Sequence, residues 1–439
     1  MTRSHRLLAL LLAFVPLRIP AQATGHPAVD SASVARAAWA RMNAARRAGD
    51  LVTARAEALR AATAWPTQPA YQWAHAVLAA RTADTAGALA ALQAYASLGV
   101  GHELDSDSVI AALRGVPGFD AVLAAHDRNR APAVHGAVFR QTSDSTLWPE
   151  GVDYDARTGD FYVGSIRHRT VVRVGRNGTT RDLWPAGTNG VGAVLGVRVD
   201  VSRRRIWATT SGMKQMDGYA PGDSALAALL RIDARTGRIE QRWDLPVVPG
   251  GHVLGDVAVG PRGEVWFSDS NEPVLYRLRP DADTLDRFRH PLFRSLQGIA
   301  PTRDGQFVYV ADYSHGLLRV RVSDGSAIRL PDAPGSTSLG CDGIVLYRGA
   351  IVAVQNGVTP ARIVRFALGG AGDSIAAARV LDQQPALAPE PTIGTMVIGR
   401  FVYVANGQFE AHDDEGRRRP NTMLTGARLV AVRVDDDGR

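Results

Sequence analysis

Six copies of one short pattern constrain the fold of this chain more than any other feature. Each copy holds two alternating apolar runs of four to six residues joined by a turn. In the clearest copy, Leu296–Val320, the runs Gly298–Pro301 and Phe307–Ala311 are hinged at Asp304-Gly305. Such alternation, bounded by Asp-Gly signals, is typical of half-buried antiparallel strands. One unit cannot bury both faces of its sheet, so the copies are expected to pack on one another.

The spacing of the copies predicts a propeller. Equivalent positions in successive copies are 45, 60, 42, 45 and 52 residues apart by subtraction: Gly151, Gly196, Asp256, Gly298, Gly343 and Thr395. Periods of about 40–50 residues, each with four short strands, are the signature of propeller blades. We therefore predict a mainly β protein with a six-bladed β-propeller over residues 137–434. Two packed β-sandwiches are the alternative. Two long insertions follow second strands, at Met213–Ala225 and Glu410–Thr422.

The segment before the propeller, residues 30–130, is rich in Ala, Leu and Arg, with apolar positions at helical spacing. Two parts of it match: Asp50 and Asp84 are 34 residues apart, as are Ala54 and Ala88. This is the period of a tetratricopeptide repeat, which the α-helical domain resembles. Such arrays present a groove to a protein partner. The alternative is that these helices only pack against the next domain.

The N-terminus predicts export. Residues 1–23 combine basic residues, the apolar run Leu7–Val15 and a small-x-small site at Ala21-Gln22-Ala23, which together are typical of a signal peptide. A frayed N-terminal helix is the alternative. Since no later stretch approaches about 18 uninterrupted apolar residues, no membrane span is expected. The predicted location is secreted or periplasmic.

Charge and cysteine usage argue against two classes of protein. The net charge of +7 comes from scattered arginines, and Lys214 is the single lysine. No basic stripe interleaved with aromatic residues is present, so no nucleic-acid partner is expected. Cys341 is the single cysteine, which excludes an internal disulfide and favours a buried small residue over a nucleophile.

Polar residues directly before the inner strands predict a metal site. Glu150, Gln297 and Asp342 occupy equivalent positions in three blades and should converge on the axis, with Asp256 one residue further along in a fourth. Carboxylate and amide oxygens suit a hard divalent cation, and Ca²⁺ is the expected ion because it takes six to eight oxygen ligands. Zn²⁺ is disfavoured because no His lies in this set. Alternatively, these side chains hydrogen-bond to the inner backbone.

The sequences Pro-Glu-Gly at Glu150, Gln-Gly-Ile at Gln297 and Asp-Gly-Ile at Asp342 resemble the SMP-30/gluconolactonase/LRE-like propellers over residues 147–434. The resemblance implies one divalent metal on the axis, with Glu150 and Asp342 matching family ligands. Gln297 stands where the family has Asn and still offers an amide oxygen.

Two positions depart further from that family. Gly255 stands where the family has its other Asn ligand, although Asp256 follows, and Val253 replaces an Arg that helps hold sugar lactones. These departures argue against gluconolactone itself as the substrate.

We therefore expect an exported metal-dependent hydrolase in which the cation polarises a lactone or ester carbonyl and lowers the pKa of bound water. The resemblance implies Asp342 as general base.

His315, Tyr313 and His252 lie on or near the same face and are candidate substrate-binding residues, although solvated turn histidines are common. Neither a Gly-x-Ser-x-Gly elbow nor a nucleotide-binding loop is present. The alternative is a non-catalytic propeller that binds a carbohydrate or peptide, with the helices recruiting a protein partner.

Overall fold

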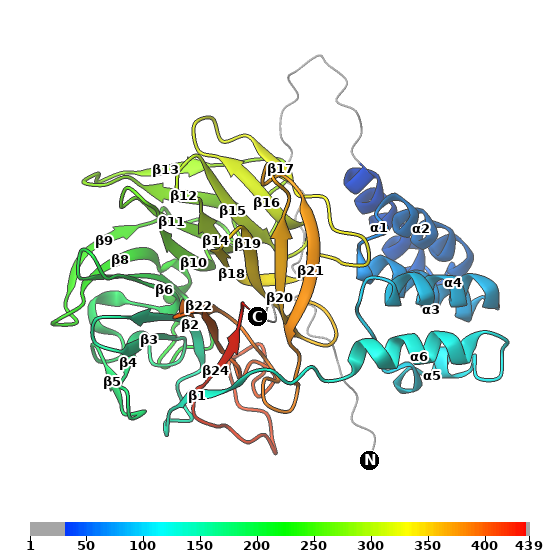
Figure 1. Ribbon diagram of the computed structural model, residues 1–439, viewed down its shortest axis with the longest axis horizontal. Coiled ribbons are helices and arrows are strands. Elements are labelled where there is room, and N and C mark those ends of the chain that lie inside the picture. Colours follow the sequence, from blue (N-terminus) through cyan, green and yellow to red (C-terminus); the bar gives the residue numbers. More distant parts are fainter. Residues whose placement is uncertain (1–30, 436–439) are drawn as a thin grey trace. The chain divides into compact units, whose positions relative to one another are not determined.

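The computed structural model describes residues 31–435 (Figure 1). The chain divides into two compact units, Met1–Arg130 and Ala131–Arg439. Helices form the first unit, and six four-stranded sheets form the second. The predicted fold class, a six-bladed β-propeller preceded by helices, is confirmed. The predicted signal peptide lies outside the described residues. None of the helices within residues 31–435 combines the length and the apolar character needed to cross a membrane.

The helical unit consists of consecutive helices that pack on one another. Its helices are α1 (Ser31–Arg47), α2 (Leu51–Ala64), α3 (Pro69–Arg81), α4 (Thr85–Ala96), α5 (Ser108–Ala111) and α6 (Phe119–Arg130). The 34-residue repetition has a local cause. Asp50 Oδ1 accepts the Thr53 amide at 3.0 Å and begins α2, and Asp84 Oδ1 accepts the Gly87 amide at 2.9 Å and begins α4. Such caps satisfy amides that have no partner inside the helix.

Each blade is an antiparallel sheet, numbered here from blade 1 to blade 6 in chain order. Blade 1 comprises β2 (Pro149–Asp155), β3 (Asp160–Ser165), β4 (Thr170–Val174) and β5 (Thr180–Asp182). Blade 2 comprises β6 (Ala193–Asp200), β7 (Arg205–Ser211), β8 (Ala227–Asp233) and β9 (Ile239–Asp244). Blade 3 comprises β10 (Leu254–Val259), β11 (Val265–Asp269), β12 (Val274–Leu278) and β13 (Leu285–Phe288).

Blade 4 comprises β14 (Leu296–Pro301), β15 (Phe307–Asp312), β16 (Gly316–Arg321) and β17 (Ala327–Arg329). Blade 5 comprises β18 (Cys341–Tyr347), β19 (Ala350–Gln355), β20 (Arg362–Leu368) and β21 (Ile375–Asp382). Blade 6 comprises β22 (Gly394–Val397), β23 (Arg400–Val404), β24 (Arg428–Arg433) and, at its outer edge, β1 (Ala137–Gln141). The ring is thus closed by pairing the propeller's first strand with its last (Figure 1).

The core is divided into layers between neighbouring blades. Each pair of adjacent blades encloses one cluster of buried apolar side chains, and the layer between blades 1 and 6 closes the circle. The innermost strand of every blade contacts the innermost strand on either side, so β2, β6, β10, β14, β18 and β22 surround one axis. Cys341 is fully buried at the start of β18, and burial raises the pKa of its thiol, which confirms the predicted buried residue.

A β-bulge recurs on the inner strand of five blades. In blade 1, Pro149 pairs with Ser165 and Val152 with Val163, which leaves one extra residue on β2. The same shift occurs in blades 2 to 5. A bulge re-aims the side chains that it contains. The adjacent glycine permits this packing, since a Cβ on Gly151 would lie 2.1 Å from the carbonyl oxygen of the neighbouring inner strand. The predicted metal ligands all fall within these bulges.

Candidate functional site

Three of the predicted ligands occupy equivalent positions on the inner strands that surround the axis. Glu150, Gln297 and Asp342 are each the second residue of an inner strand, and each is half-buried between two fully buried neighbours. Because the inner strands surround the axis, side chains that reach solvent from these bulges line the space around it. The three residues thus lie on inner strands at matching positions, and their role as metal ligands stays a prediction.

The acids are close enough to affect one another electrostatically. Burial raises the pKa of Asp342 to about 7, with a further contribution from the charge of Asp256. Burial also raises the pKa of Asp256 to about 6, although Arg198 opposes this. The pKa of Glu150 is raised well above its usual range by burial and then by Asp342, Asp256 and Glu390. The structure thus brings Glu150, Asp256 and Asp342 together.

Three buried oxygen atoms at this site have no hydrogen-bond partner in the described part of the chain. They are Glu150 Oε2, Asp256 Oδ2 and Asn356 Oδ1, all buried. Buried acceptors are normally paired, so three unpaired oxygens among mutually repelling acids indicate a place prepared for a cation or a polar ligand. Asn356 follows β19; its Nδ2 donates to Asp342 Oδ2 at 2.8 Å and to the Pro391 carbonyl at 2.9 Å. Those two bonds fix the amide beside Asp342.

Two sequence features of this site, Gln297 and Gly255, are coupled in space. Gln297 Oε1 lies 3.4 Å from the point that a Cβ on residue 255 would occupy. The longer Gln side chain therefore extends toward the space that Gly255 leaves open. Ser268 Oγ donates to the Gln297 carbonyl at 2.7 Å, which fixes the backbone at this point. The amide oxygen of Gln297 therefore lies near the place that a side chain at position 255 would occupy.

An ion pair between Arg198 and Asp153 borders the acid cluster near Asp256. Arg198 Nη1 lies 3.5 Å from Asp153 Oδ1, and Asp153 also accepts hydrogen bonds from the Val199 amide and the Thr395 hydroxyl. Asp153 is buried. Arg198 is also the cation that holds down the pKa of Asp256. Asp256 therefore belongs both to the acid cluster and to this more deeply buried charge network.

Tyr313 lies beside the acids. It is in the turn between β15 and β16 and is 37% exposed. Its hydroxyl oxygen lies 2.8 Å from the point that a Cβ on Gly357 would occupy, so only glycine leaves room for the ring. The pKa of Tyr313 is raised by burial of the hydroxyl end and by the negative charge of Asp342. Of the predicted substrate-binding residues, Tyr313 is the one that combines exposure with proximity to Asp342.

The two predicted histidines lie inside the blades. His315 is 1% exposed, and its Nδ1 lies 3.9 Å from Asp312 Oδ1. His252 is 5% exposed, with Nδ1 2.5 Å from Asp269 Oδ2 and Nε2 2.8 Å from the Pro246 carbonyl oxygen. Burial lowers the pKa of His252, but the hydrogen bonds to Asp269 and Pro246 outweigh it and the pKa is raised. The structure brings neither ring to an accessible surface.

The oxygen donors fit a cation only if amides take part. Within residues 31–435, no group of three or more His, Cys, Asp and Glu side chains is arranged to hold a metal ion. A cation at the axis would therefore draw on fewer such groups and complete its shell with amide oxygens and water. Gln297 and Asn356 supply amides there, and mixed carboxylate, amide and water shells are those that Ca²⁺ accepts.

Sequence reasoning missed Glu390, which follows β21. Its Oε1 accepts the Glu410 amide at 2.7 Å, and its charge raises the pKa of Glu150. Burial is the largest cause of its own raised pKa. Glu390 lies outside the repeated unit, in a loop that crosses to Asn406 through a parallel bridge, so no periodicity could indicate it.

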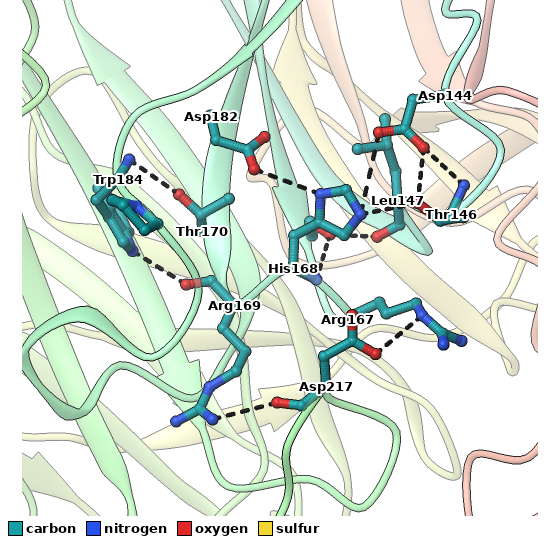
Figure 2. Close-up of polar contacts among 12 residues, drawn as sticks. Asp144, Thr146, Leu147, Arg167, His168, Arg169, Thr170, Asp182, Trp184 and Asp217 are labelled. Atoms are coloured by element: carbon teal, nitrogen blue, oxygen red, sulfur yellow. Dashed lines mark hydrogen bonds and ion pairs between the residues drawn. The ribbon is translucent and has the colours of Figure 1, made fainter.

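A second polar cluster lies at the turn between β3 and β4 of blade 1 (Figure 2). His168 Nε2 lies 2.9 Å from Thr146 Oγ1, and its Nδ1 lies 3.5 Å from Asp182 Oδ2. Thr146 and Asp144 form a turn in which Asp144 Oδ1 accepts both the amide and the hydroxyl of Thr146. Figure 2 shows His168 between the two aspartates. The cluster fixes the loop that leads into Trp148 and Glu150.

Residues 148–346 match the family model described as the SMP-30/Gluconolactonase/LRE-like region, which confirms the resemblance predicted from sequence. Similar solved structures include virginiamycin B lyase from Staphylococcus aureus, at 17% identity and TM-score 0.44, covering 63% of this chain and 83% of that one. A gluconolactonase from Xanthomonas campestris is 17% identical at TM-score 0.43, covering 69% and 98%.

An aldose sugar dehydrogenase from Streptomyces coelicolor, in its PQQ-bound form, is 15% identical at TM-score 0.45. That similarity covers 69% of this chain and 99% of the dehydrogenase. No curated protein matches the chain.

Proposed function

We propose that this protein, whose propeller matches the lactonase-like family over residues 148–346, is an exported metal-dependent hydrolase of lactones or esters. The observation that carries the proposal is the set of buried, unpaired oxygens on Glu150, Asp256 and Asn356 around Asp342. Unpaired acceptors and mutually repelling acids cost folding free energy, and a divalent cation would offset that cost. Ca²⁺ is the proposed metal because every available donor is an oxygen.

Glu150 on β2 and Asp342 on β18 would hold the cation, with Gln297 and Asn356 offering amide oxygens and Asp256 lying close by as a neighbouring carboxylate. When bound, such a cation polarises a carbonyl and lowers the pKa of a coordinated water. The chain's own residues then have two tasks, which are to orient the substrate and to accept a proton.

Asp342 is the proposed general base. Asn356 donates to one of its carboxylate oxygens, Oδ2, which fixes the orientation of the carboxylate. Tyr313 lies beside Asp342 and keeps its hydroxyl protonated at neutral pH, since its pKa is raised. A protonated phenol can donate a hydrogen bond to a lactone or ester oxygen. Tyr313 is therefore proposed to orient the substrate against Asp342.

The decisive experiment is metal analysis combined with thermal unfolding of the full-length protein, with and without Ca²⁺. Ca²⁺ should stabilise the wild type, and Asp342→Asn should abolish most of that stabilisation. Asp373→Asn is the matched control, because Asp373 is an exposed carboxylate in the same blade. If the wild type binds no metal and shows no shift with Ca²⁺, Mg²⁺ or Mn²⁺, the metal-dependent hydrolase is ruled out. Hydrolysis of a lactone and ester panel then tests the reaction.

The second candidate is a non-catalytic propeller that binds a carbohydrate or peptide. It is favoured by Gly255, which has no side chain to offer as a ligand where the related family has Asn. In this case the helices would recruit a protein partner. Metal-dependent stabilisation without turnover of any lactone or ester would support this candidate over the hydrolase.

Export is proposed from residues 1–23 alone. Expression of the full chain with its N-terminus should release a protein that begins near Thr24, as mass spectrometry of the mature form can determine. An unprocessed, cell-retained product would contradict export and would leave the chemistry of the site unaffected.

A further inference from the structure

We infer that an apolar wall beside the acid cluster selects lactones or esters that carry an apolar substituent over polyhydroxylated sugar lactones. The wall is defined by Trp148, Leu195, Met213, Met216, Val253 and Phe409, which belong to one contiguous cluster. Met213, Val253 and Phe409 are partly exposed and pack against the other three, which are buried. This inference rests on the proposed function and names the class of substrate.

The wall adjoins the acids at several points. Leu195 occupies the bulge position of blade 2 that Glu150 occupies in blade 1, and its carbonyl lies against Gly151. Trp148 precedes Glu150 by two residues. Phe409 is followed by Glu410, whose amide donates to the acid-cluster residue Glu390. One side of the site is therefore acidic and the adjoining side is apolar.

Two long loops supply half of the wall, Met213, Met216 and Phe409, and meet over blade 1. They are residues 212–226, between β7 and β8, and residues 405–427, between β23 and β24. Lys214 Nζ of the first loop lies 2.8 Å from Glu415 Oε1 of the second. A Cβ on Gly416 would lie 2.7 Å from Gln215 Cα, so the two backbones are in direct contact. Blades 2 and 6 flank blade 1, and the loops span it from either side.

The first loop is anchored to blade 1 by the contacts in Figure 2. Arg167 Nε lies 3.0 Å from Asp217 Oδ1, and the Asp217 amide donates to the Arg167 carbonyl at 3.0 Å. Arg169 Nη1 donates to the Asp217 carbonyl at 3.2 Å. The second loop is fixed through the ring of His412, which stacks on Trp148 at 3.9 Å between centroids. The wall is thus positioned before any substrate binds.

An apolar wall selects among substrates because it offers no hydrogen-bond partners to their polar groups. Sugar hydroxyls placed against Met213, Val253 and Phe409 would lose hydrogen bonds to water without gaining partners, whereas an alkyl or aryl group leaves water favourably. The acids opposite disfavour an anionic substrate, because like charges repel at close range. The expected ligand is therefore an uncharged lactone or ester with an alkyl or aryl substituent beside the scissile bond.

The test compares two six-membered lactones, δ-decalactone and glucono-δ-lactone, as substrates of the full-length protein with Ca²⁺. We expect kcat/KM to favour δ-decalactone at least about tenfold, within the range that apolar pockets achieve. Binding of the lactam analogue of δ-decalactone, which resists hydrolysis, is measured in parallel by calorimetry. Equal or better turnover of glucono-δ-lactone would overturn the inference and leave the proposed hydrolase intact.

Paired variants separate the wall from general effects on stability. Val253→Thr keeps the side-chain shape and adds a hydroxyl, so lactam binding should weaken about three- to tenfold, and Phe409→Ala should weaken it more. Val138→Thr, at an exposed position of β1, should change nothing. If the lactam binds and Val253→Thr weakens it while no lactone is hydrolysed, the hydrolase fails and the wall stands. If the lactam does not bind, or Val253→Thr binds it like wild type, the wall is refuted.

Discussion

A buried histidine of the helical unit and the buried acids at the propeller axis differ in how their polar atoms are paired. In the helical unit, His126 Nδ1 accepts the His102 amide at 3.0 Å and His126 Nε2 lies 3.0 Å from the Leu92 carbonyl oxygen. At the axis, Glu150 Oε2 and Asp256 Oδ2 are buried without a hydrogen-bond partner among the described residues. Paired polar groups specify a fold, whereas unpaired ones lower its stability and persist where function needs them. This difference is the reason that the chemistry is proposed for the propeller axis.

The largest expected effect is on turnover. Asp342→Asn removes the proposed base, so kcat/KM for a hydrolysed lactone should fall about 10²- to 10⁴-fold. In the helical unit, His126→Asn should leave kcat/KM within about twofold, since that ring makes structural contacts only. Steady-state kinetics of both variants, each checked for folding by circular dichroism, measures the contrast. Comparable losses in the two variants would break the distinction between the units.

The next effect is the pH dependence of stability, which should have opposite signs in the two units. Burial lowers the pKa of His102 to about 4, so the helical unit loses stability as pH falls from about 6.5 toward 4. The raised pKa values of Asp342, about 7, and Asp256, about 6, have the reverse effect. The metal-free propeller binds protons that the unfolded chain releases, so it gains stability as pH falls from about 7 toward 4.

Each change is expected to be on the order of 1–3 kcal/mol. Hydrogen exchange at pH 7 and pH 5 in the presence of a chelator reports on both units separately. His102→Phe should remove the helical response, and Asp342→Asn should reduce the propeller response. The same sign of response in both units would contradict the comparison.

The smallest expected effects come from single polar substitutions in the absence of metal. Asp84→Ala removes the cap of α4 and should destabilise the helical unit by about 1 kcal/mol. Glu150→Gln removes a buried carboxyl group whose ionisation is opposed by burial and by the neighbouring acids, and should stabilise the metal-free propeller by about 1 kcal/mol. Urea denaturation with a chelator measures both. A destabilising Glu150→Gln would show that the acid is paired after all.

Sequence alone predicted the features that depend on period. The spacing of the repeats located the inner strands, and from them the half-buried positions Glu150, Gln297 and Asp342. The turn residues were harder to assign. Each predicted histidine is held by an aspartate at the end of a second strand. Asp312 accepts the His315 amide, and Asp269 contacts the His252 ring, so both turns are bound from the inside of the blade. Spacing does not indicate whether a turn side chain folds inward.

The apolar wall could not be predicted for a different reason. The two insertions were visible as extra length, but Lys214 and Glu415 are 201 residues apart and meet only because the ring places blades 2 and 6 on either side of blade 1. Asn356 is different, because Cys341 pairs with Gln355 and the β18–β19 hairpin itself places Asn356 beside Asp342. Glu390, like the wall residues, reaches the acids through a loop whose path depends on the closed ring. Such residues become neighbours through tertiary structure and leave no local pattern in the sequence.

The closure of the ring has a consequence for the order of synthesis. Ala137 of β1 pairs with Ala431 of β24, and these residues are 294 positions apart by subtraction. The strand that leaves the ribosome first therefore remains without its partner until the last blade has been made. Contacts between such distant residues form slowly, so the nascent propeller exposes an open edge for most of its synthesis. A chain truncated before residue 428 would carry that unpaired edge permanently and should aggregate.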